Sequence, residues 1–353
     1  MKAVGYRQCL PVSDPACLMD LVLPDPVATG HDLLVRVQAV SVNPVDTKVR
    51  RGAPVPQGEV RILGYDASGV VEAVGDRVTR FKAGDRVYYA GSRARQGTNA
   101  ERHLVDERIV GHMPASLGFA QAAALPLTTI TAWEALFDRL QLPRRADVPG
   151  AGGAGGLTSI DALGAGTVLI TAAAGGVGSI AIQLARQLTD ARVIATASRP
   201  QSRAQALALG AHEVLDHGKP LSEGLKAAGV RWVERIFSIS HTHLHYAELC
   251  KLIAPQGRLC MIDDPPEPID VRPLKARCAS LHWEAMFTRS GFETPDMIEQ
   301  GRLLDETARL IDAGVLRTTH AATLGPISAA TLRRAHEMIE SGQTIGKIVL
   351  EGF

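Results

Sequence analysis

The pattern of hydrophobic and polar positions changes along this chain of 353 residues. Residues 33–42 (LLVRVQAVSV) alternate between apolar and polar positions, as a half-buried strand does. Residues 68–74 and 86–90 are further short apolar runs, and the Gly-Asp pairs at 75–76 and 84–85 are turn signals. Short strands joined by turns predict a small, partly open β-barrel in the N-terminal part.

From Pro126 onward the pattern instead alternates between apolar strands and segments of helical period. This order predicts an α/β fold class, with a Rossmann domain built on a doubly wound parallel sheet beside the β-barrel domain. The predicted strands lie at 192–197, 233–238 and 258–262, with an edge strand at 280–287 and a last strand at 345–350. The predicted helices lie around 248–253, near 297–313 and at 328–341.

One stretch, residues 167–188 (TVLITAAAGGVGSIAIQLARQL), joins an apolar run to a helical pattern through a glycine turn. A strand, a glycine turn and a helix in this order form the pyrophosphate-binding element of a doubly wound sheet. Phosphate must approach backbone N–H groups at the helix start, where a side chain would block it. Ala172 stands where many such loops carry their first glycine. The predicted pyrophosphate contacts are Gly175, Gly176, Val177 and Gly178.

A second glycine-rich stretch, residues 150–156 (GAGGAGG), lacks this context. The preceding residues 144–149 are polar and end in proline, and no helix start follows closely. We interpret residues 144–165 as a flexible insertion in a connection rather than as a nucleotide site.

The residues after the second predicted strand favour NADP(H) over NAD(H). An NAD-binding domain carries an acidic residue about 20 positions beyond the loop, which holds the ribose 2′-hydroxyl. This chain has Ser198 and Arg199 there, with Arg203 one helical turn later, and guanidinium groups pair well with a 2′-phosphate. The alternative is that both arginines only begin a solvated helix. Ser238 and Asp263, at the ends of later strands, complete the predicted cofactor contacts.

Composition and charge exclude several classes of partner. The net charge is +1 and aromatic residues make up 4% of the chain, which does not indicate binding to nucleic acid or to an anionic membrane. The N-terminus lacks a signal-peptide pattern and no 18-residue apolar span occurs. The cysteines are scattered without a Cys-x-x-Cys motif, as in reduced cytoplasmic proteins. We therefore expect a cytoplasmic protein with a small-molecule substrate.

Several motifs resemble the medium-chain dehydrogenase/reductase superfamily over essentially the whole chain. They are Ser41–Asp46 (SVNPVD), Gly64–Gly69 (GYDASG), Ala122–Leu136 (AAALPLTTITAWEAL), the AAAGGVG loop and the closing GKIVL strand. The closest likeness is to quinone oxidoreductases (the zeta-crystallin-like side), and within it to the group called zinc-type alcohol dehydrogenase-like. The segments SRPQSRAQALALGAHEVLDH, LIAPQGRLCMIDDP, HWEAMFTRS and TIGKIVLEGF are typical of that group.

The resemblance implies a GroES-like catalytic domain at 1–127 and 296–353 and a Rossmann dinucleotide-binding domain at 128–295. It also implies that the cofactor binds in the cleft between the two domains, and that the chain forms a homodimer, with the edge strand 280–287 as the candidate contact.

The zinc ligands of the true alcohol dehydrogenases are not matched, and we predict no metal site. By motif position, Asn43 replaces the first Cys, Tyr65 replaces the His, and residues 121–136 contain no Cys for the third ligand. The four-cysteine structural lobe is missing as well, because no cysteine lies between Cys17 and Cys250. Asparagine and tyrosine are not the sulfur and imidazole ligands that zinc requires.

Candidate catalytic residues come from the same segments. Asn43 can donate through its amide, Tyr65 carries a phenol, and Lys48 stands where several quinone reductases carry a tyrosine. Thr131 matches a threonine that lies near the nicotinamide in relatives. The alternative for Asn43 is that Asn43-Pro44 only shapes a turn.

For other residues too, a structural role competes with a functional one. Asp46 more often holds a local loop than reacts. Trp133, Trp283 and Phe287 either line the pocket or pack in the core, and core packing is favoured.

His241, His243 and His245, with Cys250 close by, form the one rival metal signal. The alternative is a polar helix start, which we favour.

Three functions remain open. Without zinc to stabilise an alkoxide, hydride donation from NADPH into a quinone or an α,β-unsaturated carbonyl is the easier chemistry. The second possibility is an alcohol dehydrogenase that binds metal through unrecognised ligands, and the third is a non-catalytic NADPH-binding protein.

Overall fold

The computed structural model describes residues 1–145, 164 and 166–353, and its contacts divide the chain into two compact units. The first unit comprises residues 1–130 and 286–353, and the second comprises residues 131–285. The predicted insertion at 144–165, with the 150–156 glycine stretch, lies almost wholly outside the described residues.

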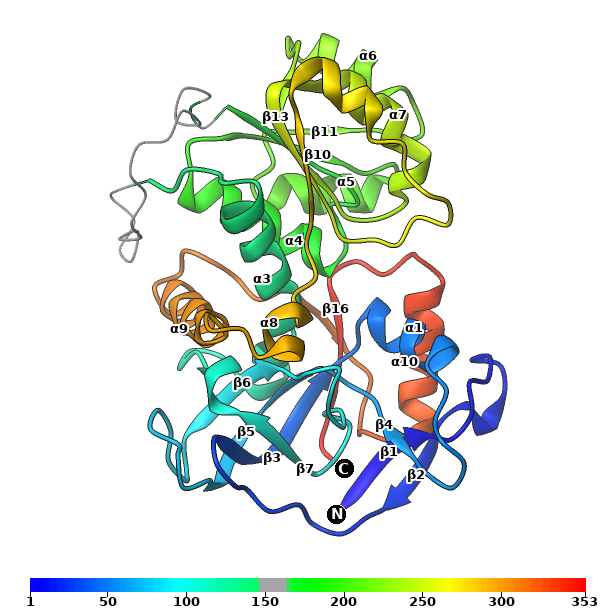
Figure 1. The fold of residues 1–353 in the computed structure, drawn as a ribbon, viewed down its shortest axis with the longest axis vertical. Coiled ribbons are helices and arrows are strands. Elements are labelled where there is room, and N and C mark those ends of the chain that lie inside the picture. The colour runs from blue at the N-terminus through cyan, green and yellow to red at the C-terminus, as the bar shows by residue number, and fades with distance from the viewer. Residues whose placement is uncertain (146–163, 165) are drawn as a thin grey trace. The chain divides into compact units, whose positions relative to one another are not determined.

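The second unit is built on a six-stranded sheet whose neighbouring strands are all parallel (Figure 1). The order is β11-β10-β9-β12-β13-β14, so the first strand in sequence lies next to the second and the fourth. This is the doubly wound Rossmann order, in which the connections reverse direction beside the first strand. Its strands are β9 (Thr167–Ile170), β10 (Arg192–Thr196), β11 (Glu213–Leu215), β12 (Val233–Ser238), β13 (Ile253–Met261) and β14 (Ser280–Trp283).

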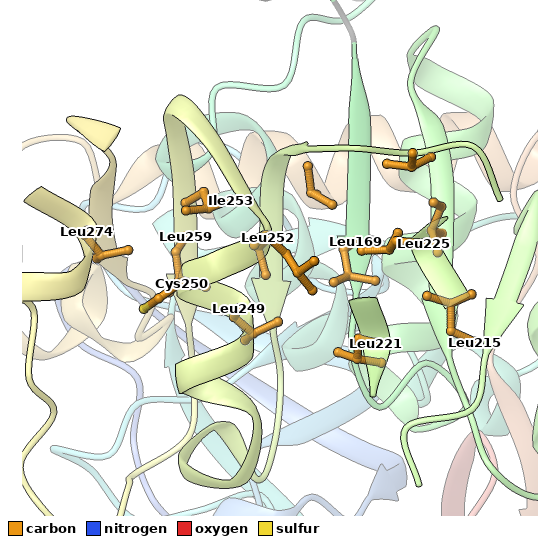
Figure 2. Close-up of a cluster of buried hydrophobic side chains, with 14 of the residues drawn as sticks. Leu169, Leu215, Leu221, Leu225, Leu249, Cys250, Leu252, Ile253, Leu259 and Leu274 are labelled. Carbon is orange, nitrogen blue, oxygen red and sulfur yellow. The ribbon is translucent and has the colours of Figure 1, made fainter. Parts of the chain in front are cut away.

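Helices pack on this sheet because its strands are apolar on both faces, as continuous buried runs require. In one core cluster, Leu169 of β9 meets Leu221 and Leu225 of one helix and Leu249 and Leu252 of another (Figure 2). The helices of this unit are α4 (Gly176–Leu188), α5 (Pro200–Ala208), α6 (Leu221–Ala227) and α7 (Thr242–Leu252), with a 3-10 helix at Arg272–Arg277. Before them, α3 (Pro126–Trp133) runs into a π-helix at Glu134–Arg139.

The first unit contains two sheets. One has the order β15-β16-β3-β5-β6-β8 with β7 also paired to β3, and the other has the order β2-β1-β4. The long strand β3 (Asp32–Ser41) carries β5 on one edge and shares its other edge between β7 and β16. The remaining strands are β1 (Lys2–Tyr6), β2 (Met19–Val22), β4 (Arg61–Ile62), β5 (Asp66–Val74), β6 (Arg86–Ala90), β7 (Arg102–Asp106), β8 (Val110–His112), β15 (His320–Thr323) and β16 (Lys347–Glu351).

Helices of the first unit connect and cover these sheets. They are α1 (Pro44–Gly52), α2 (Phe119–Ala123), α8 (Phe287–Phe292), α9 (Ile298–Asp312) and α10 (Ala329–Glu340), with 3-10 helices at Pro15–Cys17 and Glu107–Ile109. Ser328 caps α10 by accepting a hydrogen bond from the Thr331 N–H, which explains why the helix begins where the sequence predicts it.

The structure differs from the sequence prediction around residues 280–295. The predicted edge strand 280–287 ends at Trp283, and Phe287 begins α8 instead. The predicted domain boundary at 295/296 lies at 285/286 in the structure, and the one at 127/128 lies at 130/131. The physical reason is that Met286 is buried and Phe287 packs on Tyr65, so α8 belongs to the first unit. Within the described ranges, no helix is long and apolar enough to cross a membrane.

Candidate active site

A buried lysine ion pair lies at the end of β3, in the segment where the sequence places the lost zinc ligands. The Lys347 ammonium is 3.0 Å from the Asp66 carboxylate, and both side chains are almost fully buried. Lys347 also donates hydrogen bonds to the Val42 carbonyl at 3.0 Å and to the side-chain oxygen of Asn43. The pairing of β16 with β3, with Val349 opposite Ser41, brings Lys347 here.

The Asn43 amide is fully used inside this network. Its Nδ2 donates to Asp66 Oδ2 at 2.8 Å and to the Ser41 carbonyl at 3.3 Å, while its Oδ1 accepts from Lys347. An amide nitrogen has two protons, so neither is left for a substrate in this conformation. This arrangement favours the turn-shaping role of Asn43 over donation to a ligand.

Asp46, in the first turn of α1, ties that helix to the loop before Tyr65. Its carboxylate accepts hydrogen bonds from the backbone N–H groups of Asn43 at 2.7 Å and of Gly64 at 3.1 Å. Burial is the main cause that raises the pKa of Asp46 to about 7, and the Lys347 ammonium opposes that rise. The residue therefore holds the local loop.

Tyr65 is a buried phenol at the edge of this network. The residue is 2% exposed, and its ring meets the Phe287 ring edge-on, with the centroids 4.9 Å apart. Burial, followed by the nearby Asp46 charge, raises the pKa of Tyr65 to about 12, whereas Arg61 and Arg93 act in the opposite direction. The phenol is therefore neutral at physiological pH and keeps a proton to donate.

The other two predicted catalytic residues lie on helices. Lys48 is exposed on α1, two residues beyond Asp46. Thr131 is buried on α3, in the second unit. The structure thus groups Asn43 and Tyr65 around Asp46.

The predicted glycine turn has the geometry that close helix–loop packing needs. Gly175 is the N-cap of α4, and no side chain caps this helix start. A Cβ atom on Gly178 would lie 2.6 Å from Ala173 Cα and 2.7 Å from the Ala172 carbonyl oxygen, so only glycine fits there. Ala172 has φ of 50°, a left-handed conformation that favours glycine. The free N–H groups of the first turn are what an anion would bind.

The predicted 2′-phosphate residues follow β10. Arg199 is the N-cap of α5 and Ser198 is exposed. Arg203 donates to the Ala197 carbonyl at 3.3 Å. In the portion of the chain that the structure describes, neither arginine has a carboxylate partner.

Ser238 and Asp263 are joined through Thr242. The Ser238 and Thr242 hydroxyls are 2.7 Å apart, and Asp263 accepts from the Thr242 N–H at 2.8 Å. These two predicted cofactor residues therefore also fasten the start of α7 to the sheet edge.

The aromatic candidates have three different environments. Trp133 is buried against Phe137 and the Arg144 guanidinium, in agreement with core packing. Trp283 is 53% exposed on the edge strand β14, so the expectation of core packing is wrong for this residue. Phe287 packs on Tyr65, because α8 turns into the first unit.

The histidine cluster does not assemble a metal centre. His241 precedes α7 in a left-handed conformation, and its ring lies 6.4 Å from that of His243. Among the residues that the structure describes, no group of three or more His, Cys, Asp or Glu side chains is arranged to hold a metal ion. The polar helix start is the interpretation that fits.

Four polar residues of this region were not selected from the sequence: Lys347, Asp66, Arg61 and Arg93. One signal pointed to Lys347, because it is the charged residue inside the apolar closing strand IGKIVL, and a lysine is almost never buried there unless paired. No sequence signal identifies its partner, since Asp66 lies far away along the chain.

Known protein families match the two ends of the chain. A model described as the alcohol dehydrogenase GroES-like domain matches residues 29–134, and one described as a zinc-binding dehydrogenase matches residues 209–350. A zinc-type alcohol dehydrogenase-like protein of Staphylococcus epidermidis is 35% identical over 351 residues, which cover 99% of both chains. A quinone oxidoreductase of Lama guanicoe is 30% identical over 251 residues, or 70% of this chain and 68% of that protein.

Solved structures of similar proteins superpose on essentially the whole of this chain. A putative zinc-dependent alcohol dehydrogenase from Rhizobium etli CFN 42 superposes with a TM-score of 0.92 at 53% identity, covering 100% of this chain and 98% of that one. The mycobacterial protein Rv1454c, solved in complex with NADPH, has a TM-score of 0.77 at 25% identity, covering 99% and 100% of the two chains.

Proposed function

The chain belongs to the medium-chain dehydrogenase/reductase superfamily of oxidoreductases, and on that premise we propose that it reduces a quinone or an α,β-unsaturated carbonyl with NADPH, without zinc. The observation that carries this proposal is the buried Lys347–Asp66 ion pair beside Asn43. The likeness to the quinone oxidoreductase of Lama guanicoe supports the substrate class.

The residues present do not fit zinc. Asn43 and Tyr65 stand at two of the predicted ligand positions, and the Asn43 amide already serves Asp66 and Lys347. An ammonium 3.0 Å from Asp66 would repel a second cation at that carboxylate. No step of the reaction is therefore assigned to zinc.

The cofactor residues do fit a phosphorylated dinucleotide. The uncapped start of α4 offers N–H groups to a pyrophosphate, and Arg199 and Arg203, which have no carboxylate partner among the described residues, offer two guanidinium groups to a 2′-phosphate. The mycobacterial relative solved with NADPH supports this choice. When bound, NADPH supplies a hydride.

Tyr65 is the best candidate for the group that assists hydride acceptance. Its neutral phenol can donate a hydrogen bond to a carbonyl oxygen that becomes negative, and can then give it the proton. Phe287 holds the ring edge-on, and Asp46 holds the loop that carries it. Asn43 acts as a positioning residue through Asp66.

A substrate panel tests this function directly. We expect NADPH oxidation with quinones and enones, little with simple alcohols and NADP⁺, and undiminished turnover in a chelator. Stoichiometric zinc together with loss of activity in the chelator would favour a metal-dependent alcohol dehydrogenase. NADPH binding without turnover of any electrophile would favour a non-catalytic protein.

The cofactor preference has its own test. In Arg199→Ala with Arg203→Ala, we expect NADPH to bind about tenfold or more weakly, because each charge-assisted contact contributes about 1.5–3 kcal/mol. NADH binding should change little, since NADH lacks the phosphate. If the dissociation constants for NADPH and NADH rose equally, these arginines would be structural and the basis for NADP(H) would be removed.

We also propose that the chain forms a homodimer through β14. This strand is an edge of the parallel sheet and exposes Trp283. An exposed strand edge with a large apolar side chain is a ready pairing surface. Sedimentation as a monomer at all protein concentrations would contradict this assembly.

A further inference from the structure

The carboxyl ends of three neighbouring strands in the second unit follow the order of the parts of a dinucleotide. One side of the sheet has the order β11-β10-β9, and β10 and β11 pair in parallel, with Thr196 opposite Leu215 (Figure 1). The proposed pyrophosphate turn follows β9, and the proposed 2′-phosphate arginines follow β10. Neighbouring strands are about 4.8 Å apart. Extending this order by one strand brings the base, which is attached to the same ribose, to the end of β11.

His217 provides an aromatic ring at that end. It lies two residues beyond β11, and residues 197–199 and 216–220, which follow β10 and β11, contain no Phe, Tyr or Trp. The centroid of its imidazole lies 6.1 Å from that of His245 on α7, at an interplanar angle of 61°. Both residues are partly exposed, so a ligand can reach this pair of rings.

Hydrogen bonds hold the loop after β11 and α7 in place. Asp216 Oδ1 accepts from the Gly218 N–H at 2.9 Å, which fixes the turn that contains His217. Glu248 of α7 accepts from the N–H and the hydroxyl of Ser222 at 2.9 and 2.8 Å, which joins α7 to the start of α6. The two rings are therefore preorganised, and ordering them costs little when a ligand binds.

These imidazoles suit a neutral base better than a phosphate. Burial is the main cause that lowers the pKa of both His217 and His245. The His217 charge adds to the effect at His245, whereas Asp216 opposes it at His217 and Glu248 opposes it at His245. From an ordinary value of 6.5, a lowered pKa leaves both rings neutral at physiological pH. A neutral imidazole can stack on a base, as other aromatic side chains do.

We propose that His217, supported by His245, stacks against the adenine base of the dinucleotide at the end of β11. This inference rests on the proposed function, since it extends the site of the proposed cofactor by one strand. Arg199 and Arg203 distinguish NADPH from NADH through the 2′-phosphate. The ring of His217 contributes equally to both cofactors, because both contain adenine.

The test compares ligand fragments by calorimetric titration of the full chain. In His217→Ala, we expect the dissociation constants of NADPH, NADH and ADP-ribose to rise by about tenfold, the effect of one lost contact between a base and an aromatic ring. Reduced nicotinamide mononucleotide lacks adenine, so its dissociation constant should stay within about twofold of the wild-type value.

Two further variants control for structural effects. His217→Phe keeps a planar ring and should bind ADP-ribose within about twofold of the wild type. His212→Ala is the matched control, because it removes an exposed histidine just before β11, at the opposite end of that strand. It should change none of these dissociation constants.

The other outcomes would overturn the inference. If ADP-ribose bound to His217→Ala as tightly as to the wild type, the ring would not contact the base. A weakening confined to NADPH would assign His217 to the 2′-phosphate instead. If the wild type bound neither NADPH nor ADP-ribose, the cofactor assignment and the inference would both be wrong. Intact binding without turnover would contradict only the reductase function.

Discussion

The polar network around Lys347 and the glycine turn before α4 differ in whether their polar groups have hydrogen-bond partners within the protein. In the network, Asn43, Asp46 and Asp66 all use their polar atoms on partners inside the first unit. At the turn, the N–H groups at the start of α4 have no side-chain cap. Groups that are satisfied internally fix a shape, whereas groups left open at a helix start are available to a ligand.

The largest effect should come from removing the charge at the centre of the network. Lys347→Met leaves the Asp66 carboxylate buried without its cation, which should lower the free energy of unfolding by about 3–5 kcal/mol. Urea unfolding at neutral pH measures this. The double variant Lys347→Met with Asp66→Asn removes both charges and should recover part of the loss. If Lys347→Met were as stable as the wild type, the Asp66 carboxylate would not depend on Lys347 for its stabilisation.

The network should also make stability depend on pH. The pKa of Asp46 is about 7 in the folded state and about 3.9 in unfolded chains, so the folded protein binds this proton more tightly. Its stabilising contribution is complete below pH 4 and is lost as pH rises towards 7, by up to about 4 kcal/mol. Unfolding free energies between about pH 5 and pH 8 should therefore fall more steeply for the wild type than for Asp46→Asn. If the unfolding free energies of the wild type and Asp46→Asn changed with pH in parallel, Asp46 would not be the source of this pH dependence.

At the turn, steric substitutions should separate packing from binding. Gly178→Ala places a Cβ against the Ala173 backbone and should cost about 1–3 kcal/mol of stability, with weaker NADPH binding as a consequence. Gly175→Ala meets only the Ala172 oxygen, at 3.7 Å, so it should keep its stability and lose mainly NADPH affinity. Thermal unfolding and cofactor titration distinguish the two. If Gly175→Ala and Gly178→Ala lost equal stability, a Cβ atom would not be less tolerated at Gly178 than at Gly175.

The smallest expected effect is an increase in the free energy of unfolding. Ala172→Gly relieves a left-handed alanine and should raise the free energy of unfolding by up to about 1 kcal/mol. Ala174→Gly, at a neighbouring position without positive φ, should lower it instead. A thermal midpoint that falls in Ala172→Gly would mean that the methyl group of Ala172 contributes packing that outweighs its strain.

Most of the fold prediction relied on patterns among residues that are close together in the sequence. The strand, glycine turn and helix over 167–188 and the helix near 328–341 follow from local period and capping, which a sequence displays directly. The end of the edge strand at Trp283 did not follow, because the apolar residues up to Phe287 fit either a strand or a turn towards another unit. Tertiary contact with Tyr65 decided it.

The sequence by itself determined that Asn43 and Tyr65 stand in the motif positions compared with zinc ligands, and that a glycine turn at 175–178 joins a strand to a helix. Only the tertiary structure decided which polar groups remain available. Lys347 reaches Asp66 because β16 pairs with β3, and Phe287 meets Tyr65 because α8 belongs to the first unit. Such pairings depend on strand register and on burial across hundreds of residues, and no local pattern in the chain encodes them.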